Sequence, residues 1–150
     1  MRSYHIDVTE RTAADPATVY RLLRDGSTWP EWSTTIDSFT LEKEGDGEPE
    51  GVGAVRIFRN GRIVGRDEIL GFTPDSAFSY RHVKGLPVRG YRGDVDLRQQ
   101  GGGTEIRWRV TFAPLIPGTG RLLHRALTRF VGKTVRELAT YSATKAGFVG

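Results

Sequence analysis

The segment from Thr119 to Ala146 has the pattern of one long amphipathic helix, and it follows a stretch, residues 36–112, that carries only strand and turn patterns. Its apolar stripe recurs at helical spacing and consists of Leu123, Leu127, Phe130, Val131, Thr134, Leu138 and Tyr141. A helix of this length spans roughly 40 Å. Only a broad sheet covers so long a stripe, and a curved sheet that grips a helix tends to leave a hollow that can hold a ligand.

Length and composition predict one domain that spans residues 1–150. Because the chain has no cysteine, disulfides, thiolate metal sites and cysteine nucleophiles are excluded. The N-terminal residues 1–16 are polar and no long apolar run follows, so we expect a cytoplasmic protein without stable membrane insertion. The net charge is +4, but most basic residues are scattered among acids, and the one basic stripe, Arg121, Arg125, Arg129 and Arg136 on the last helix, is expected to be its solvated outer face. This distribution argues against nucleic acid as a partner.

The order of the predicted elements is one strand, two short helices, six antiparallel strands and the long helix. Asp15 and Pro16 are typical of a helix start, and Trp29 to Trp32 suits a second short helix or turn. Asn60 and Gly61 predict a two-residue hairpin turn. The predicted strands are 4–12, 36–43, 52–59, 62–72, 78–83, 88–98 and 104–112.

If Asn60 and Gly61 form the whole turn, Ile57 faces Val64 and Val55 faces Arg66. This register groups Val55, Ile57, Val64, Arg66, Glu68, Leu70 and Phe72 on one face, which is the more apolar one and is expected to point inward. The other face, with Arg56 and Asp67, is then expected to point to solvent.

The later strands alternate more clearly between apolar and charged residues. Their apolar sides carry Phe78, Tyr80, His82, Tyr91, Val95, Leu97, Ile106, Trp108, Val110 and Phe112. The predicted hollow is therefore largely aromatic. Its few polar groups are expected to be Arg66, Glu68, His82 and the hydroxyls of Tyr80 and Tyr91.

Four segments resemble a known family: DPATVYRLL at 15–23, WPEW at 29–32, RDEILGFTP at 66–74 and GLPVRGYRGDV at 85–95. Together with the element order they resemble the START and Bet v 1-like helix-grip superfamily, and within it the SRPBCC group of polyketide cyclases, dehydrases and lipid-transport proteins. The resemblance covers roughly residues 4–141. It implies an α+β helix-grip fold, in which a curved seven-stranded antiparallel sheet, two short helices and one long C-terminal helix enclose a cavity. Members bind lipids, hormones, polyketides or quinones, so the fold does not decide the activity.

The candidate ligand-binding residues come from the predicted inner face and from the helix stripe. They are Val55, Ile57, Arg66, Glu68, Leu70, Tyr80, His82, Tyr91, Trp108, Phe112, Leu127, Phe130, Thr134 and Leu138. Arg66 and Glu68 are alternatively surface residues if the strand faces the other way. Tyr80, Tyr91 and Trp108 build the core, line the hollow, or do both. Trp29 and Trp32 are expected to anchor the short helices, or else to form a lip of the cavity mouth.

Three hypotheses about function remain open. The leading one is a module that binds one small hydrophobic or amphipathic molecule, such as a lipid or a polyketide. The second is an aromatase/cyclase-like enzyme for aldol condensation and dehydration, in which His82 or Glu68 moves protons and Arg66 and Tyr91 polarise carbonyls. No carboxylate stands at a spacing that would clearly orient His82. The third is a stress or chaperone cofactor that acts through its surface.

No cofactor and no metal are expected. Gly132, Lys133 and Thr134 imitate the end of a phosphate-binding loop but lie inside a helix, and the three histidines show no recognisable ligand spacing. The sequence does not indicate an oligomeric state.

Overall fold

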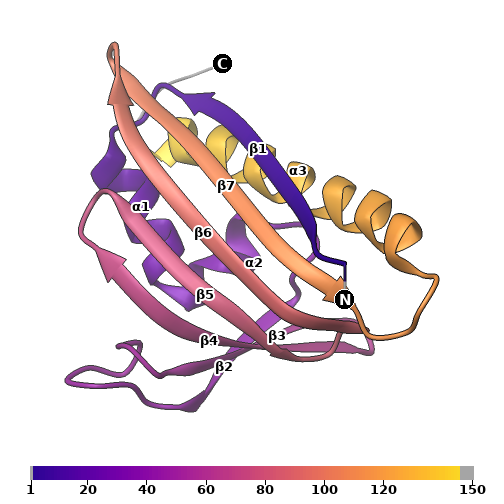
Figure 1. Ribbon diagram of the computed structural model, residues 1–150. Coiled ribbons are helices and arrows are strands. Elements are labelled where there is room, and N and C mark those ends of the chain that lie inside the picture. The colour runs from indigo at the N-terminus through magenta and orange to yellow at the C-terminus, as the bar shows by residue number, and fades with distance from the viewer. Residues whose placement is uncertain (1, 146–150) are drawn as a thin grey trace.

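The computed structural model describes residues 2–145, which contain a seven-stranded antiparallel sheet in the order β1-β7-β6-β5-β4-β3-β2 (Figure 1). The strands are β1 (Tyr4–Thr12), β2 (Ser38–Lys43), β3 (Val55–Asn60), β4 (Ile63–Thr73), β5 (Ala77–Lys84), β6 (Val88–Gln100) and β7 (Gly103–Pro114). The helices are α1 (Pro16–Arg24), the short 3-10 helix η1 (Gly26–Thr28), α2 (Trp29–Trp32) and α3 (Gly120–Lys145). The predicted α+β helix-grip architecture is confirmed.

The first helix begins where the sequence predicts it. The Asp15 carboxylate accepts a hydrogen bond from the Thr18 N–H at 3.0 Å, and Pro16 occupies the first helical turn. Both features satisfy the free end of a helix. The buried side of α1 consists of Val19, Leu22 and Leu23. This short helix therefore packs against the sheet through one apolar face.

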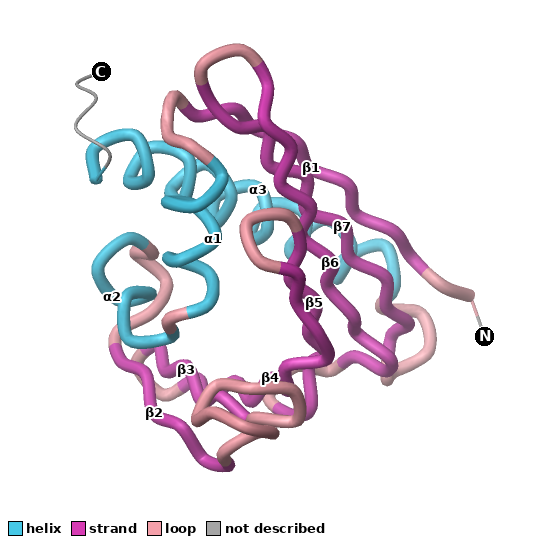
Figure 2. Tube along the Cα trace, turned by 90° about the vertical axis from the view of Figure 1, so that its left-hand side faces the viewer, coloured by secondary structure: helices cyan, strands magenta, loops and turns pink. Residues whose placement is uncertain are grey.

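The long helix α3 lies across the concave side of the sheet and packs mainly against β1 (Figure 2). Leu127, Val131, Val135 and Leu138 are buried along its length. The Thr12 hydroxyl donates to the Ala139 carbonyl oxygen at 2.8 Å and ties the end of β1 to the helix. No helix among residues 2–145 combines the length and the apolarity needed to span a bilayer.

The β3–β4 hairpin differs from the predicted register by two residues. Asn60 stays in the strand and pairs with Ile63, so the turn is formed by Gly61 and Arg62 and not by Asn60 and Gly61. Gly61 alone takes a positive φ, of 58°, and its N–H donates to the Asp37 carboxylate at 2.6 Å. A shift by two keeps the same residues on each face, so Ile57 now pairs with Arg66 and Val55 with Glu68.

The predicted sidedness of this hairpin is wrong. Arg66 and Glu68 lie on the outer face, which points away from the helices, and form ion pairs with Glu42 at 2.7 Å and Arg81 at 2.5 Å. Val55 and Ile57 share that face. The inner face instead carries Arg56 and Asp67. The apolar content of the two faces predicts the wrong inner face for this hairpin. The outer face contains charged residues that are stabilised by ion pairs between strands, and the inner face contains a buried cation.

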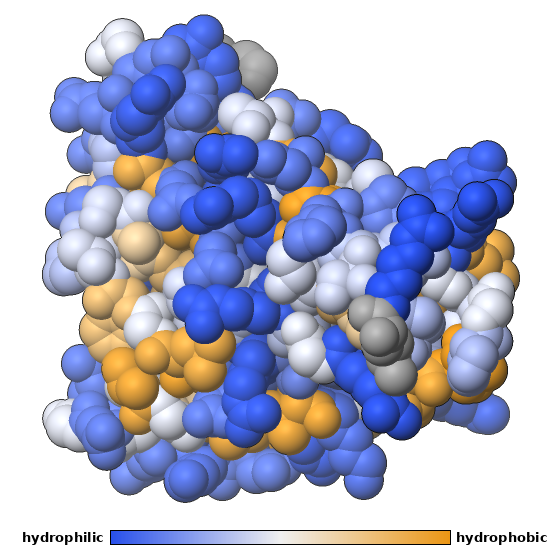
Figure 3. Space-filling model, in the orientation of Figure 1, coloured by the Kyte–Doolittle hydropathy of each residue, from blue (hydrophilic) through white to orange (hydrophobic). Residues whose placement is uncertain are grey.

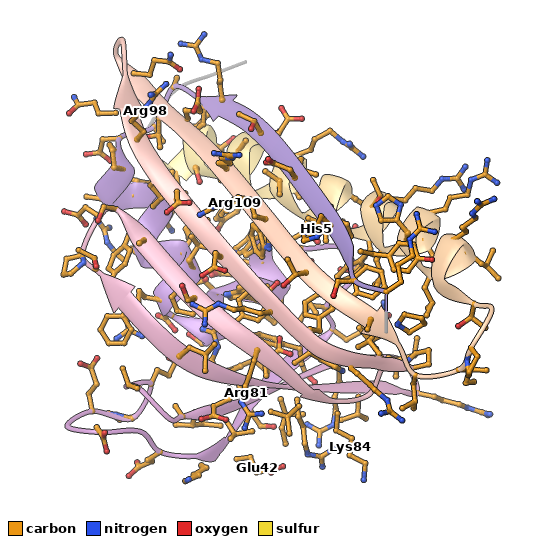
Figure 4. All side chains as sticks on the ribbon, viewed as in Figure 1. His5, Glu42, Arg81, Lys84, Arg98 and Arg109 are labelled. Carbon is orange, nitrogen blue, oxygen red and sulfur yellow. The ribbon has the colours of Figure 1, made fainter. Side chains whose placement is uncertain are left out.

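The outer face of the sheet is mostly hydrophilic in the space-filling view (Figure 3). Arg81 and Arg109, labelled in Figure 4, are about half-exposed there. Arg109 pairs with Asp96 at 2.5 Å. The charged side chains of the later strands thus point to solvent, as the alternation predicts.

A bulge in β4 places both Ile69 and Phe72 on the core side of the sheet. The pairing between β4 and β5 shifts between Ile69 and Gly71, so Ile69 pairs with Tyr80 while Phe72 pairs with Phe78. Both Ile69 and Phe72 therefore pack on the core side, although simple alternation assigns them to opposite faces. Leu70 is the residue within this irregularity and does not line the cavity.

Candidate ligand-binding site

A cavity of about 330 Å³ lies between the inner face of the sheet, α2 and α3. Most of its wall is apolar or aromatic. The lining residues are Trp29, Ser33, Thr35, Ile36, Arg56, Phe58, Asn60, Ile63, Gly65, Asp67, Tyr80, His82, Gly85, Leu86, Tyr91, Trp108, Ala126, Leu127, Phe130, Val131 and Thr134. The volume and the lining are typical of a site for a small organic molecule.

The mouth of the cavity is indicated by those lining residues that are exposed. Ile63 is 61% exposed and Phe130 is 41% exposed, and Asn60, Gly85 and Ala126 are exposed as well. They belong to the β3–β4 hairpin, the β5–β6 loop and α3, which meet at one end of the molecule (Figure 1). A ligand therefore has a route to the cavity between the tips of these elements.

The aromatic wall is held by specific packing. The Trp108 indole N–H donates to the Tyr80 hydroxyl oxygen at 3.1 Å, and the two rings meet edge to face with centroids 6.1 Å apart. Tyr91 lies 6.3 Å from Tyr80 and packs on Phe112. Gly93 permits this arrangement, since a Cβ there would lie 2.3 Å from the Tyr80 ring. The wall is thus held together by ring packing and a hydrogen bond between its own residues.

Both tyrosine hydroxyls stay protonated over a wide pH range. Burial raises the pKa of Tyr80 and of Tyr91 well above the ordinary tyrosine value, and the charge of the Asp67 carboxylate adds to both increases. These hydroxyls are hydrogen-bonding groups at neutral pH, and neither is a ready base.

Asp67 and His82 form a hydrogen-bonded pair across β4 and β5. The distance between His82 Nδ1 and Asp67 Oδ1 is 2.9 Å, and the Leu86 N–H donates to His82 Nε2 at 3.0 Å. Since a main-chain N–H is always a donor, Nε2 accepts and the ring proton is on Nδ1. The carboxylate that the sequence pattern did not supply for His82 is therefore Asp67, but both ring nitrogens are already engaged.

Arg56 is a buried cation at the inner end of the cavity, with 2% of its side chain exposed. Its Nη1 donates to the Leu23 carbonyl oxygen at 3.0 Å and lies 3.3 Å from Glu50 Oε1. Burial lowers the pKa of the guanidinium, while Glu50 and Asp67 act in the opposite direction. The carbonyl groups at the end of α1 and Glu50 offset the cost of removing this charge from water.

The structure brings together only part of the predicted site. Tyr80, His82, Tyr91, Trp108, Leu127, Phe130 and Thr134 line the cavity, whereas Phe112 and Leu138 are buried in the core. Val55, Ile57, Arg66, Glu68 and Leu70 do not line it. Of the weak catalytic candidates, only His82 faces the cavity. Whether any of these residues contacts a ligand stays a prediction.

Several lining residues were not expected from the sequence. Arg56, Phe58 and Asp67 line the cavity because the β3–β4 hairpin has the opposite sidedness to the predicted one. The sequence signal that could have indicated this sidedness is the presence of Phe58 and Ile69 on the same face. Trp29 both packs on Phe58, with ring centroids 4.7 Å apart, and lines the cavity. This packing is that of the expected anchor, and Trp29 lies in the buried wall of the cavity, 8% exposed, rather than at a lip of its mouth.

Solved structures share this fold at low sequence identity. The chain matches Ara h 8.0201 with a TM-score of 0.77 and 16% identity, covering 95% of this chain and 99% of the other. It matches the di-domain ARO/CYC StfQ from the steffimycin biosynthetic pathway with a TM-score of 0.77 and 16% identity, covering 97% of this chain and 52% of that one. It matches a START superfamily protein from Mycobacterium smegmatis with a TM-score of 0.73 and 13% identity, covering 95% and 97%.

No curated protein matches the sequence significantly. The family described as polyketide cyclase / dehydrase and lipid transport matches residues 4–143. This range includes every strand, every lining residue of the cavity and nearly all of α3. The chain therefore belongs to the polyketide cyclase/dehydrase and lipid-transport family.

Proposed function

We propose that the protein binds one small, largely apolar molecule in the cavity between the sheet and α3, and that it carries or senses this molecule without transforming it. The observation that supports binding is the aromatic cavity with an exposed mouth. Its aromatic walls pack on one another, and such pre-organisation lowers the entropic cost of holding a ligand.

The state of His82 favours carriage over catalysis. A general base needs a free lone pair within reach of the substrate. The lone pair of Nε2 accepts the Leu86 N–H, and Nδ1 donates to Asp67. Arg66, one of the two polarising groups of the enzyme hypothesis, and Glu68, its alternative to His82 for moving protons, are engaged in ion pairs on the outer face.

A cyclase or dehydratase is the second candidate, because Asp67 orients His82 at the cavity wall. It requires the β5–β6 loop to move so that Leu86 releases Nε2. Replacement of His82 by Ala separates the two. A carrier keeps its affinity for an apolar probe within a few fold, whereas an enzyme that uses His82 loses roughly 100-fold or more in rate.

Two glycines of β4 allow a direct test of the cavity. A Cβ at Gly65 meets nothing closer than His82 Cε1 at 3.8 Å, and Gly65 lines the cavity. Gly65→Leu therefore places its side chain in the hollow. Gly71, in the same strand, has nothing within 4 Å of an added Cβ and does not line the cavity, so Gly71→Leu is the matched control.

The test is a fluorescence titration with N-phenyl-1-naphthylamine, and thermal melts verify that all three proteins are folded. We expect the wild-type protein and Gly71→Leu to bind the probe, and Gly65→Leu to bind it at least roughly ten-fold more weakly, equivalent to about 1.4 kcal/mol. Equal binding by all three proteins would mean that the probe binds outside the cavity. If this probe does not bind to the wild-type protein at micromolar concentrations, the ligand-binding proposal fails and the surface-acting hypothesis takes its place.

A further inference from the structure

The cavity wall contains a carboxylate whose charge is not neutralised by its partner. Asp67 lines the cavity, and 21% of its side chain is exposed. Its Oδ1 accepts a hydrogen bond from His82 Nδ1, while Oδ2 has no hydrogen-bond partner among residues 2–145. Because the Leu86 N–H fixes His82 as the neutral tautomer, the pair keeps the full negative charge of Asp67.

The nearby cation does not cancel this charge, although Arg56 pairs with Asp67 in the β3–β4 register. The Arg56 guanidinium forms its ion pair with Glu50, at 3.3 Å. Among the ion pairs of residues 2–145, no Arg56 nitrogen lies within 4.0 Å, the limit for an ion pair, of an Asp67 oxygen. The three groups Arg56, Glu50 and Asp67 together therefore carry one negative charge in excess.

The aromatic rings around Asp67 favour the same kind of ligand. His82 lies against the Tyr91 ring, with centroids 5.8 Å apart, and the Tyr80 and Trp108 rings complete this part of the wall. Aromatic faces have negative potential and attract cations. The net charge of the chain is +4, but exposed charges are screened beyond roughly 8–10 Å at physiological salt, so the groups in the wall dominate inside the cavity.

We infer that the ligand has an apolar body with an N–H or O–H donor that binds Asp67 Oδ2, an ammonium group being the best fit and a carboxylate the worst. This inference rests on the proposed function and specifies the ligand class for the same cavity. A donor group binds the oxygen that the protein leaves free, and a positive charge on it neutralises the excess carboxylate.

The test uses three compounds with one naphthalene skeleton, namely 2-naphthylmethylamine, 2-naphthylmethanol and 2-naphthoate. Each displaces N-phenyl-1-naphthylamine from the wild-type protein, from Asp67→Asn and from Glu68→Gln. Asp67→Asn keeps an acceptor for His82 Nδ1 but removes the charge. Glu68→Gln removes the neighbouring carboxylate, which pairs with Arg81 on the outer face.

We expect the wild-type protein and Glu68→Gln to prefer the amine over the alcohol by roughly ten-fold or more, because both compounds donate a hydrogen bond to Asp67 but only the amine adds a positive charge. In Asp67→Asn the two compounds bind alike. Should this variant melt early, the ranking of the three compounds on the wild-type protein tests the inference without it.

The outcomes separate this inference from the proposed function. If the reporter and the alcohol bind and the amine shows no advantage, the inference is wrong while the proposed function stands. If 2-naphthoate binds most tightly, the ligand is an acceptor, and Arg56, whose buried Nε has no partner among residues 2–145, becomes its anchor in place of Asp67. If neither the reporter nor any of the three compounds binds, the proposed function itself fails, and the inference with it.

Discussion

The Arg56 guanidinium donates to the Leu23 carbonyl oxygen at 3.0 Å, so a cation from the start of β3 binds the C-terminal end of α1. The same Nη1 approaches the Arg24 carbonyl oxygen at 3.4 Å. The rings of Trp29, Phe58 and Phe78 surround the guanidinium at 5.0–5.3 Å. This contact joins the short helices to the sheet at the inner end of the cavity.

Replacement of Arg56 by Met removes these bonds and leaves Glu50 without its ion-pair partner, although the Gly26 N–H still donates to Glu50 and the Trp29 indole N–H still donates to the Leu23 carbonyl oxygen. We expect the free energy of unfolding to fall by about 1–3 kcal/mol in urea denaturation. Arg66→Met is the control, because its ion pair with Glu42 is exposed and is worth less than about 1 kcal/mol. Equal losses in the two variants contradict the structural role of Arg56.

Tyr80 and Tyr91 determine an alkaline limit of stability. Burial raises the pKa of both hydroxyls above the unfolded value of about 10, so the folded state binds more protons than the unfolded state at higher pH. Their contribution is therefore complete below about pH 10 and is lost as the pH rises further. In an alkaline titration, we expect their tyrosinate absorbance to appear only with unfolding. Tyr91→Phe should reduce the tyrosinate absorbance that appears with unfolding. Ionisation of both hydroxyls in the folded protein would contradict this prediction.

Two residues of α3 should respond differently to truncation. Leu138 is fully buried, and Leu138→Ala is expected to cost about 2–5 kcal/mol in unfolding free energy. Phe130 is 41% exposed at the cavity mouth, so Phe130→Ala should change stability by no more than roughly 0.5–1 kcal/mol while weakening probe binding. Thermal melts and probe titrations measure both quantities. A large stability loss at Phe130 with unchanged binding would mean that it is a core residue.

The β5–β6 loop should respond to the loss of the His82 ring. The Leu86 N–H donates to His82 Nε2 at 3.0 Å. Since His82→Ala removes this acceptor, we expect the hydrogen-exchange protection factor of the Leu86 amide to be lower in the variant than in the wild-type protein. A Leu86 amide protected equally in both proteins is held by something other than His82.

Much of the fold could be predicted from local patterns. β1 begins at Tyr4 and ends at Thr12 as its alternation predicts, and Asp15 caps α1. The stripe of α3 also predicts its buried side. These features depend on periodicity and capping, which are local properties of the sequence.

The site was harder to predict because it depends on contacts between distant residues. Arg56 is buried since Leu23, Arg24 and Glu50 lie next to it, and no spacing along the chain shows this. The pairing of Asp67 with His82 depends on an irregular register between β4 and β5. Alternation therefore predicts the inner face of the later, aromatic strands, while the charged residues of the β3–β4 hairpin lie on the face opposite to the predicted one.

The most direct test of the account is the position of a bound probe. Intermolecular nuclear Overhauser effects between N-phenyl-1-naphthylamine and the methyl groups of the protein identify the residues that it touches. We expect contacts from the probe to Leu127 and Val131, which belong to α3 and line the cavity. Contacts only to Leu122 and Ile116, which are exposed outside the cavity, would contradict the account.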